Sequence, residues 1–162
     1  MTGDKAIMVP VHVRDLTIAD LPACAWSGTP THLRYVAKEL ARVARGDADY
    51  LAICTPADLP VAIGAIDHRA EAGMLWQVTV HPALRSVGLG SMLVRAAETR
   101  MRAHGMTRSE LSVEESNPRA RALYERLGYV AYGREPDAWD EEAPDGSIHR
   151  YETMCTLMAK QL

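Results

Sequence analysis

The stretch Val78-Thr79-Val80-His81-Pro82-Ala83-Leu84-Arg85-Ser86-Val87-Gly88-Leu89-Gly90 decides how this chain folds. A β-branched, apolar run ends at a proline, a short loop with two glycines follows, and an apolar pattern of helical period continues to His104. A strand, a glycine loop and a helix start, in that order, leave backbone N–H groups free at the positive end of the helix dipole. The stretch therefore predicts a site for a phosphate or pyrophosphate.

Two familiar nucleotide-binding loops do not fit this stretch. A Walker loop ends in Gly-Lys-Ser/Thr, which holds the terminal phosphates and magnesium, whereas Gly90 is followed by Ser91. A dinucleotide fingerprint needs a third glycine, but Leu93 stands at that position. What remains is Arg-x-x-Gly-x-Gly, read from Arg85, Gly88 and Gly90, and a plain turn at a helix start would also account for it.

A second motif begins about 27 residues after the loop and has the form Asn-x-x-Ala-x-x-Leu-Tyr-x-x-x-Gly-Tyr, from Asn117 to Tyr129. Its local physics predicts a helix, because asparagine is a good N-cap, Pro118 suits the first helical position and Gly128 suits the position just past the end. By itself this motif would indicate only a well-capped helix.

Together the two motifs resemble the signatures of the GNAT superfamily of acyl-CoA-dependent N-acetyltransferases, in the right order and separated by one helix and one strand. The resemblance runs from about residue 10 to the end and is sharpest over 74–132. It implies an α/β (α+β) fold in one GNAT-like domain over residues 1–162. A mixed, mostly antiparallel central sheet of about six to seven strands would be flanked by about four helices around a β-α-β core that binds acetyl-CoA.

The apolar periodicity of the chain agrees with such a fold. Strands are predicted at 9–14, 50–55, 61–66, 74–80, 108–114 and 148–157, and helices near 17–21, 31–45, 90–104 and 117–127. Hairpins join the strands within 50–80, whereas the helix at 90–104 should cross between two parallel strands. Gly133 to Pro136 predicts a turn, and the acidic stretch 135–145 is expected to form a loop.

The resemblance also implies how acetyl-CoA would lie. The pyrophosphate would be held by backbone N–H groups of Ser86, Val87, Gly88, Leu89, Gly90 and Ser91, with Arg85 closing the loop. The edge of the strand at Val78 and Val80 would pair with the pantetheine amides, since the strands at 74–80 and 108–114 splay apart in this family. Asn117 would reach the pantetheine, and Arg119 and Arg121 are candidates for the 3′-phosphate.

Tyr124 is the predicted catalytic residue, because the matching tyrosine in GNAT enzymes lies near the thioester sulfur and assists the departing thiolate. An unperturbed tyrosine has a pKa of about 10 and a thiol one of about 8.5, so complete proton transfer is uphill by about 2 kcal/mol. We therefore expect Tyr124 to donate a hydrogen bond to the developing thiolate rather than to transfer its proton completely. The alternative is that Tyr124 is an ordinary core residue.

The general base is less clear from the sequence. A lysine-like ammonium costs about 4–5 kcal/mol to deprotonate at pH 7, and a base or desolvation must offset this cost. Related enzymes carry a glutamate at what aligns here as Met74 or Ser112, and neither is acidic. Glu114 is the best remaining residue, and a proton path through water is an alternative. Weaker choices are Glu115, Asp67, His68 and His81.

The predicted reaction is direct transfer of the acetyl group of acetyl-CoA to a primary amine, either of a small cationic molecule or of a peptide or protein. The alternatives are a non-catalytic acyl-CoA-binding sensor, which the missing glutamates would favour, and an unrelated α/β domain that binds nothing. The acidic stretch 135–145 is either solvated surface or the lining of an acceptor pocket that attracts a cationic amine.

Composition argues against several other classes of protein. A net charge of −3 argues against a general nucleic-acid binder. The three cysteines are too few and too scattered for a disulfide framework or a CxxC metal site, so no metal is expected. The chain lacks an apolar run long enough for a membrane helix, and the first five residues do not begin a signal peptide, so a cytoplasmic protein is expected. The resemblance also allows a homodimer.

Overall fold

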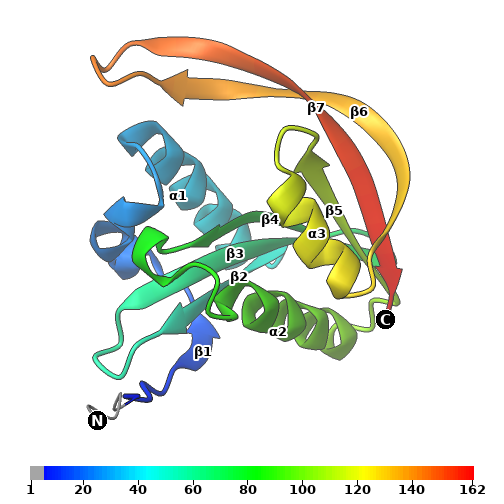
Figure 1. Cartoon of the computed structure of the whole chain (residues 1–162), viewed down its shortest axis with the longest axis horizontal. Coiled ribbons are helices and arrows are strands. Elements are labelled where there is room, and N and C mark those ends of the chain that lie inside the picture. The colour runs from blue at the N-terminus through cyan, green and yellow to red at the C-terminus, as the bar shows by residue number, and fades with distance from the viewer. Residues whose placement is uncertain (1–5) are drawn as a thin grey trace, which may run out of the picture.

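The computed structural model describes residues 6–162 (Figure 1). The first five residues, where the absence of a signal peptide was expected, lie outside the described part. In chain order the elements are β1 (His12–Asp15), η1 (Ile18–Ser27), α1 (Pro30–Ala44), β2 (Ala48–Cys54), β3 (Pro60–His68), β4 (Ala72–Val80), η2 (Pro82–Leu84), α2 (Leu89–Ala103), β5 (Arg108–Glu114), α3 (Pro118–Arg126), β6 (Val130–Glu142) and β7 (Ile148–Gln161).

These strands form a seven-stranded sheet in the order β1-β2-β3-β4-β5-β7-β6. Every neighbouring pair is antiparallel except β4 and β5, which run parallel. Helix α2 connects β4 to β5, as the sequence predicts for a β-α-β core. The expected fold class, a mostly antiparallel mixed sheet with flanking helices, is confirmed.

Two apolar cores lie on the two faces of the sheet. The larger one packs α2 and α3 against the sheet through residues such as Leu93, Met101, Leu111 and Tyr124. The smaller one packs η1 and α1 against β2 and β3 through residues such as Val36 and Tyr50. Because the two faces are covered by different helices, the sheet is the layer that separates the two cores (Figure 1).

The prediction of a turn and a loop for residues 133–142 was wrong. Residues 133–136, expected as a turn, lie inside β6, which pairs with β7 from Val130↔Ala159 to Glu142↔Ile148. The acidic stretch is therefore mostly strand, with a turn between Glu142 and Ile148. β6 is an edge strand, and such a strand tolerates Pro136 because one side of its backbone has no neighbour to pair with. In Figure 1 this long hairpin arches away from the sheet and over α1.

Smaller differences concern strand ends. The first strand spans His12–Asp15 rather than 9–14, and β7 continues to Gln161 rather than ending near 157. Local sequence patterns predict the ends of strands poorly, because pairing with a neighbouring strand decides how far a strand extends.

Candidate active site

The parallel strands β4 and β5 pair over only part of their length. Residues Ala72–Leu75 pair with Arg108–Leu111, and beyond Leu75 the two strands share no register. β4 also bulges there, because Gln77 has a φ of +52° and the pairing with β3 shifts register nearby. The hydroxyl of Tyr50 donates a hydrogen bond to Oε1 of Gln77 at 2.9 Å and so holds the bulge. The splay between these strands, which the family resemblance implies, is present.

A cleft of about 600 Å³ opens where the strands part. Most of the residues predicted to bind the cofactor or to act in catalysis line it. They are Val78, Val80, Arg85, Ser86, Gly88, Leu89, Gly90, Ser91, Asn117 and Tyr124. The two others, Val87 and Glu114, are absent from the lining, and the side chain of Val87 is exposed to solvent. Their roles stay predictions, but the structure brings the first ten together.

One end of the cleft is suited to a phosphate group. The first helical hydrogen bond of α2 runs from Met92 N–H to Gly88 C=O, so the amides of residues 89–91 have no acceptor within the helix. Gly88 has a φ of +96°, a conformation that favours glycine. A Cβ on Gly90 would lie 3.2 Å from the side chain of Leu123 of α3, so a larger residue here would press on that side chain. The free amides and the helix dipole together favour an anion.

The arginines of α3 divide into two groups. Arg119 donates a hydrogen bond to the hydroxyl of Ser86 and lines the cleft, so it lies beside the phosphate loop. Arg126 lines the cleft as well, although the sequence analysis did not single it out. Arg121 points along the helix to Glu125, with Nε 2.8 Å from Oε1, and is not part of the lining. Arg119 is therefore better placed than Arg121 for the 3′-phosphate.

Asn117 caps α3, as the sequence predicts, since its Oδ1 accepts a hydrogen bond from Ala120 N–H at 3.1 Å. The cap holds Asn117 at the mouth of the cleft. Because Asn117 both caps α3 and lines the cleft, it fixes where α3 begins relative to the site.

Tyr124 is 8% exposed and packs into the larger core while lining the cleft. Burial raises the pKa of its hydroxyl to about 12. Against a thiol pKa of about 8.5, complete proton transfer to a thiolate would then be uphill by about 5 kcal/mol. The hydroxyl stays protonated at neutral pH, so it can donate a hydrogen bond to a developing negative charge.

Glu114 lies at the end of β5, half-buried, and its Oε1 accepts a hydrogen bond from the hydroxyl of Tyr151 at 2.8 Å. Along β5, Leu111 and Val113 are buried in the larger core, so Glu114 points to the opposite face of the sheet. Tyr151 could not be found from the sequence, because its contact depends on the pairing of β7 with β5.

The weaker candidates for a base are engaged elsewhere. Glu115 is exposed and pairs with Arg134, which lowers the pKa of the Glu115 carboxyl. Asp67 pairs with Arg42 of α1. Nε2 of His68 donates a hydrogen bond to Oδ2 of Asp49 at 2.8 Å, at the other end of β3 from the splay. The remaining candidate, His81, caps η2, because its Nδ1 accepts a hydrogen bond from Ala83 N–H.

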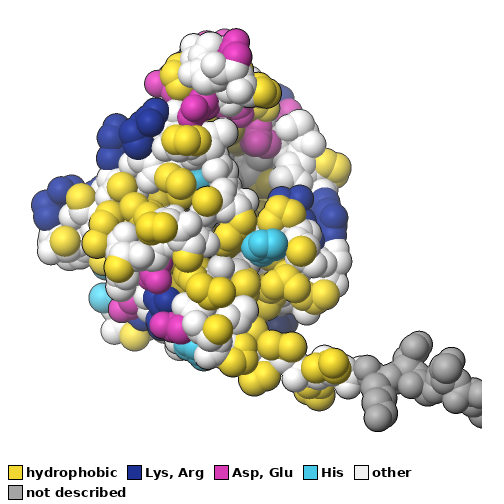
Figure 2. Space-filling model, turned by 90° about the vertical axis from the view of Figure 1, so that its left-hand side faces the viewer, with side chains coloured by type: hydrophobic (Ala, Val, Ile, Leu, Met, Phe, Trp, Pro, Cys, Tyr) yellow, Lys and Arg dark blue, Asp and Glu magenta, His cyan; other side chains and the backbone are white. Residues whose placement is uncertain are grey.

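A second pocket, of about 380 Å³, lies between the start of α1 and β6. Acidic and aromatic side chains and a histidine line it: His32, Tyr35, Trp139, Asp140, Glu141 and Glu142. Figure 2 shows acidic side chains gathered toward the tip of the β6–β7 hairpin, above a hollow in the surface. The ring of Trp139 lies 5.0 Å from that of Tyr151, which in turn contacts Glu114. A continuous set of contacts therefore links this pocket to Glu114.

His32 gives this pocket a buried polar atom. Its Nε2 is buried and has no hydrogen-bond partner within residues 6–162, and burial lowers the pKa of the imidazole. The ring packs so closely that a Cβ on Gly28 would come within 2.8 Å of it. A neutral imidazole with an unused nitrogen beside carboxylates is suited to a polar, cationic ligand.

Comparison with protein-family models matches residues 18–129 to the Acetyltransferase (GNAT) family. A mycothiol acetyltransferase from Beutenbergia cavernae is 43% identical over 61 residues, which make up 38% of this chain and 20% of that protein. The chain therefore spans about a fifth of the length of this curated relative.

Solved structures agree with the fold. The ribosomal-protein-S18-alanine N-acetyltransferase from Escherichia coli superposes with a TM-score of 0.74 at 20% identity, covering 94% of each chain. A spermidine N-acetyltransferase from Vibrio cholerae, solved with CoA and spermine, has a TM-score of 0.67 at 16% identity, covering 93% of this chain and 95% of that one. At these identities the likeness concerns the fold. Within residues 6–162, none of the helices is long and apolar enough to cross a membrane.

Proposed function

Because this chain belongs to the GNAT acetyltransferase family, we propose that it uses acetyl-CoA to acetylate a primary amine of a cationic acceptor. The observation that carries the proposal is the cleft at the splay of β4 and β5. It joins the free amides of the phosphate loop, the open edge of β4 and the buried Tyr124 hydroxyl in one site. An anion-binding end and an apolar end suit the two ends of a CoA thioester.

The proposed reaction is direct attack. Glu114 takes a proton from the ammonium group of the acceptor, directly or through water. The neutral amine then attacks the thioester carbonyl carbon, a C–N bond forms, and the C–S bond breaks. The nitrogen releases its second proton to solvent, and CoA leaves as the thiolate. Tyr124 donates a hydrogen bond to the charge that develops on sulfur, which lowers the barrier without complete proton transfer.

The acceptor class follows from the second pocket. Asp140 and Glu141 supply negative charge, and Tyr35 and Trp139 supply aromatic faces on which a cationic amine can rest. A carboxylate-lined hollow would repel an acidic metabolite and attract a cation. A polyamine-like molecule or a basic peptide fits this chemistry, and the Vibrio cholerae neighbour named above was solved with spermine.

The first experiment is calorimetric titration of the protein with acetyl-CoA, beside the double variant Arg85→Ala, Gly88→Asp. We expect micromolar binding by the native chain and its loss in the variant, because aspartate would repel the pyrophosphate and Arg85 would no longer close the loop. No binding by the native chain would overturn the cofactor assignment.

The second experiment is a panel of amines assayed for release of free CoA, with the native chain and Tyr124→Phe. We expect turnover with cationic amines, and a fall in kcat of about 10²-fold in the variant without a change in acetyl-CoA affinity. Tight binding without turnover of any amine would instead identify an acyl-CoA-binding sensor.

The acceptor pocket has its own test. The variant Asp140→Asn, Glu141→Gln should raise the KM for a cationic amine and leave the KM for acetyl-CoA unchanged. Glu152→Gln is a matched control, because it removes an exposed charge of the same hairpin that lies outside the pocket. Equal kinetics for the two variants would contradict the acceptor assignment.

We also propose that the protein is cytoplasmic, which the three free, buried cysteines support, and that residues 1–162 form one domain. A homodimer stays a prediction.

A further inference from the structure

Two histidines and an aspartate meet at the end of the molecule away from the cleft. Asp49 is the second residue of β2, His68 ends β3, and His104 caps the C-terminus of α2. The phosphate loop lies at the N-terminus of the same helix. The 15 residues of α2 place the two ends about 22 Å apart. The proposed transfer reaction uses none of these three side chains.

The three ligand atoms converge on one point. Nε2 of His68 lies 2.8 Å and Nε2 of His104 lies 2.9 Å from the same oxygen, Oδ2 of Asp49. The two rings are 4.7 Å apart between centroids. All three atoms lie within 4.8 Å of one another, as metal ligands must.

The spacing is close to that of a tetrahedral metal site. With metal–nitrogen and metal–oxygen distances of about 2.0–2.1 Å, neighbouring ligand atoms of a tetrahedral zinc ion are about 3.3 Å apart. The nitrogen–oxygen distances would have to open by only about half an ångström from the observed hydrogen bonds. Small rotations of the side chains are enough, and Asp49 and His68 are already mostly buried.

Arg100 orients the carboxylate without occupying the converging oxygen. Its Nη1 donates to Oδ1 of Asp49 at 2.9 Å, so Oδ2 is left to face the imidazoles. Its Nη2 donates to Asp15 at 2.7 Å, which balances the arginine charge. With both histidines neutral, the charges of Asp49, Arg100 and Asp15 sum to about −1 before a divalent ion binds. In metal sites a ligating carboxylate is itself hydrogen-bonded by an outer partner, which is the role that Arg100 would have here.

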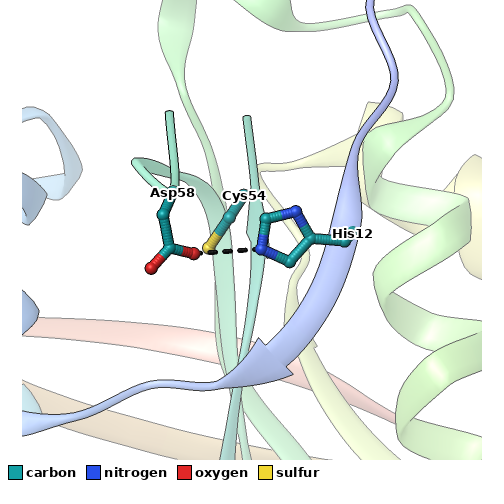
Figure 3. A group of neighbouring side chains, drawn as sticks. All are labelled: His12, Cys54 and Asp58. Atoms are coloured by element: carbon teal, nitrogen blue, oxygen red, sulfur yellow. Dashed lines mark hydrogen bonds and ion pairs between the residues drawn. The ribbon is translucent and has the colours of Figure 1, made fainter. Parts of the chain in front are cut away.

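A second group of potential ligands is less suitable. His12, Cys54 and Asp58 also lie within ligand distance of one another, as Figure 3 shows. There His12 Nε2 and Arg14 Nε contact the same Oδ1 of Asp58, at 3.0 and 2.8 Å. The arginine therefore holds the oxygen that a cation would need. Burial also raises the pKa of the Cys54 thiol, which opposes the thiolate form that binds metals.

We propose that Asp49, His68 and His104 bind one divalent transition-metal ion of the zinc class. Two imidazoles and a carboxylate suit zinc, whereas magnesium and calcium prefer oxygen ligands. The ion would tie the C-terminus of α2 to β2 and β3 and thereby stabilise the folded chain. No metal was expected from the sequence, because the three cysteines form no metal-binding motif. Asp49, His68 and His104 could not be found there, because they follow no metal-binding spacing along the chain.

The test uses the full chain after treatment with a chelator. Zinc added at a slight molar excess should raise the unfolding temperature, and magnesium at the same concentration should not. Calorimetry should give one zinc ion per chain. Cobalt substitution should produce the visible absorption of a tetrahedral site.

His104→Gln is the decisive variant, because His104 is 43% exposed at a helix end and its loss should leave the fold intact. We expect zinc affinity to fall at least about tenfold. His12→Gln is the matched control and should bind zinc like the native chain. The proposal is overturned if the native chain binds no zinc, if His104→Gln binds as well as native, or if His12→Gln abolishes binding.

Discussion

Glu142 and Thr31, which are 111 positions apart, form a two-point contact that joins the tip of the β6–β7 hairpin to α1. Oε2 of Glu142 accepts hydrogen bonds from Thr31 N–H at 3.0 Å and from the Thr31 hydroxyl at 2.9 Å. Thr31 is the second residue of α1, so the carboxylate lies at the positive end of the helix dipole. The contact closes one side of the second pocket.

The contact makes Glu142 a structural residue, unlike its neighbours in the pocket. Glu142→Ala should lower the free energy of unfolding by about 1–3 kcal/mol, because it removes two charge-assisted hydrogen bonds from a buried threonine. Urea denaturation would measure the change. Glu135→Ala, at an exposed position of the same strand, should stay within about 0.5 kcal/mol of native. Equal free energies of unfolding for the two variants would show that the Glu142–Thr31 contact does not stabilise the hairpin.

Glu114 is expected to act as the base. Glu114→Gln should lower kcat/KM for the amine by 10²-fold or more and abolish the acid limb of its pH profile, with acetyl-CoA affinity unchanged. Glu115→Gln, beside it but exposed and paired with Arg134, should change the rate less than about twofold. Full activity in Glu114→Gln would favour a proton path through water.

Tyr151 should position Glu114 rather than take part in the chemistry. Tyr151→Phe removes the hydroxyl that donates to the carboxylate, so kcat should fall about tenfold and the acid limb of the pH profile should move. A fall in rate without a shift of this limb would indicate a role in packing against Trp139 instead.

Arg119 and Arg121 form a natural pair for testing the 3′-phosphate assignment. Arg119→Ala should weaken acetyl-CoA binding about tenfold, because the lost group is a charged hydrogen-bond donor beside the phosphate loop. Arg121→Ala should leave affinity unchanged, since Arg121 faces Glu125. Calorimetry with CoA and with dephospho-CoA would check the assignment. If Arg119 contacts the 3′-phosphate, the variant and native proteins should bind dephospho-CoA equally.

Asp20 should make stability depend on acid pH. Its hydrogen bonds from Arg14 hold the pKa of the Asp20 carboxyl at about 2, below its ordinary value of 3.8. The lowered pKa stabilises the fold fully above about pH 4, and this stabilisation is lost as the pH falls through 2. Asp20→Asn should therefore lower the free energy of unfolding by about 1–2 kcal/mol at pH 7 and by progressively less below pH 4. Urea denaturation between pH 3 and pH 7 would measure this difference, and a constant difference would contradict it.

The local motifs were readable from the sequence because their physics is local. Gly88 suits a left-handed turn and Gly90 a close contact with Leu123 at the start of α2, and Asn117 caps the helix that it begins. Each effect acts within a few residues along the chain. The strand pattern, the parallel crossover and the family followed from the same short-range signals.

The edge hairpin was not readable because few of its side chains are buried. Both faces of β6 are largely exposed, so its residues show no alternation of apolar and polar types, and Gly133 and Pro136 resemble a turn. Pairing with β7 is what makes it a strand. For this reason the sequence left open whether the acidic stretch lines a pocket, and it gave no sign of the Glu142 contact.

By itself, then, the sequence determined the phosphate loop, the capped helix with Tyr124 and the family, since hydrogen bonds and backbone conformations within one turn of the chain specify them. Only the tertiary structure decided which distant groups meet: Tyr151 with Glu114, Glu142 with Thr31, and two histidines with Asp49. The physical reason is that these contacts depend on strand register and on the angle at which α1 and α2 pack. Both are set by burial of the whole core rather than by neighbouring residues.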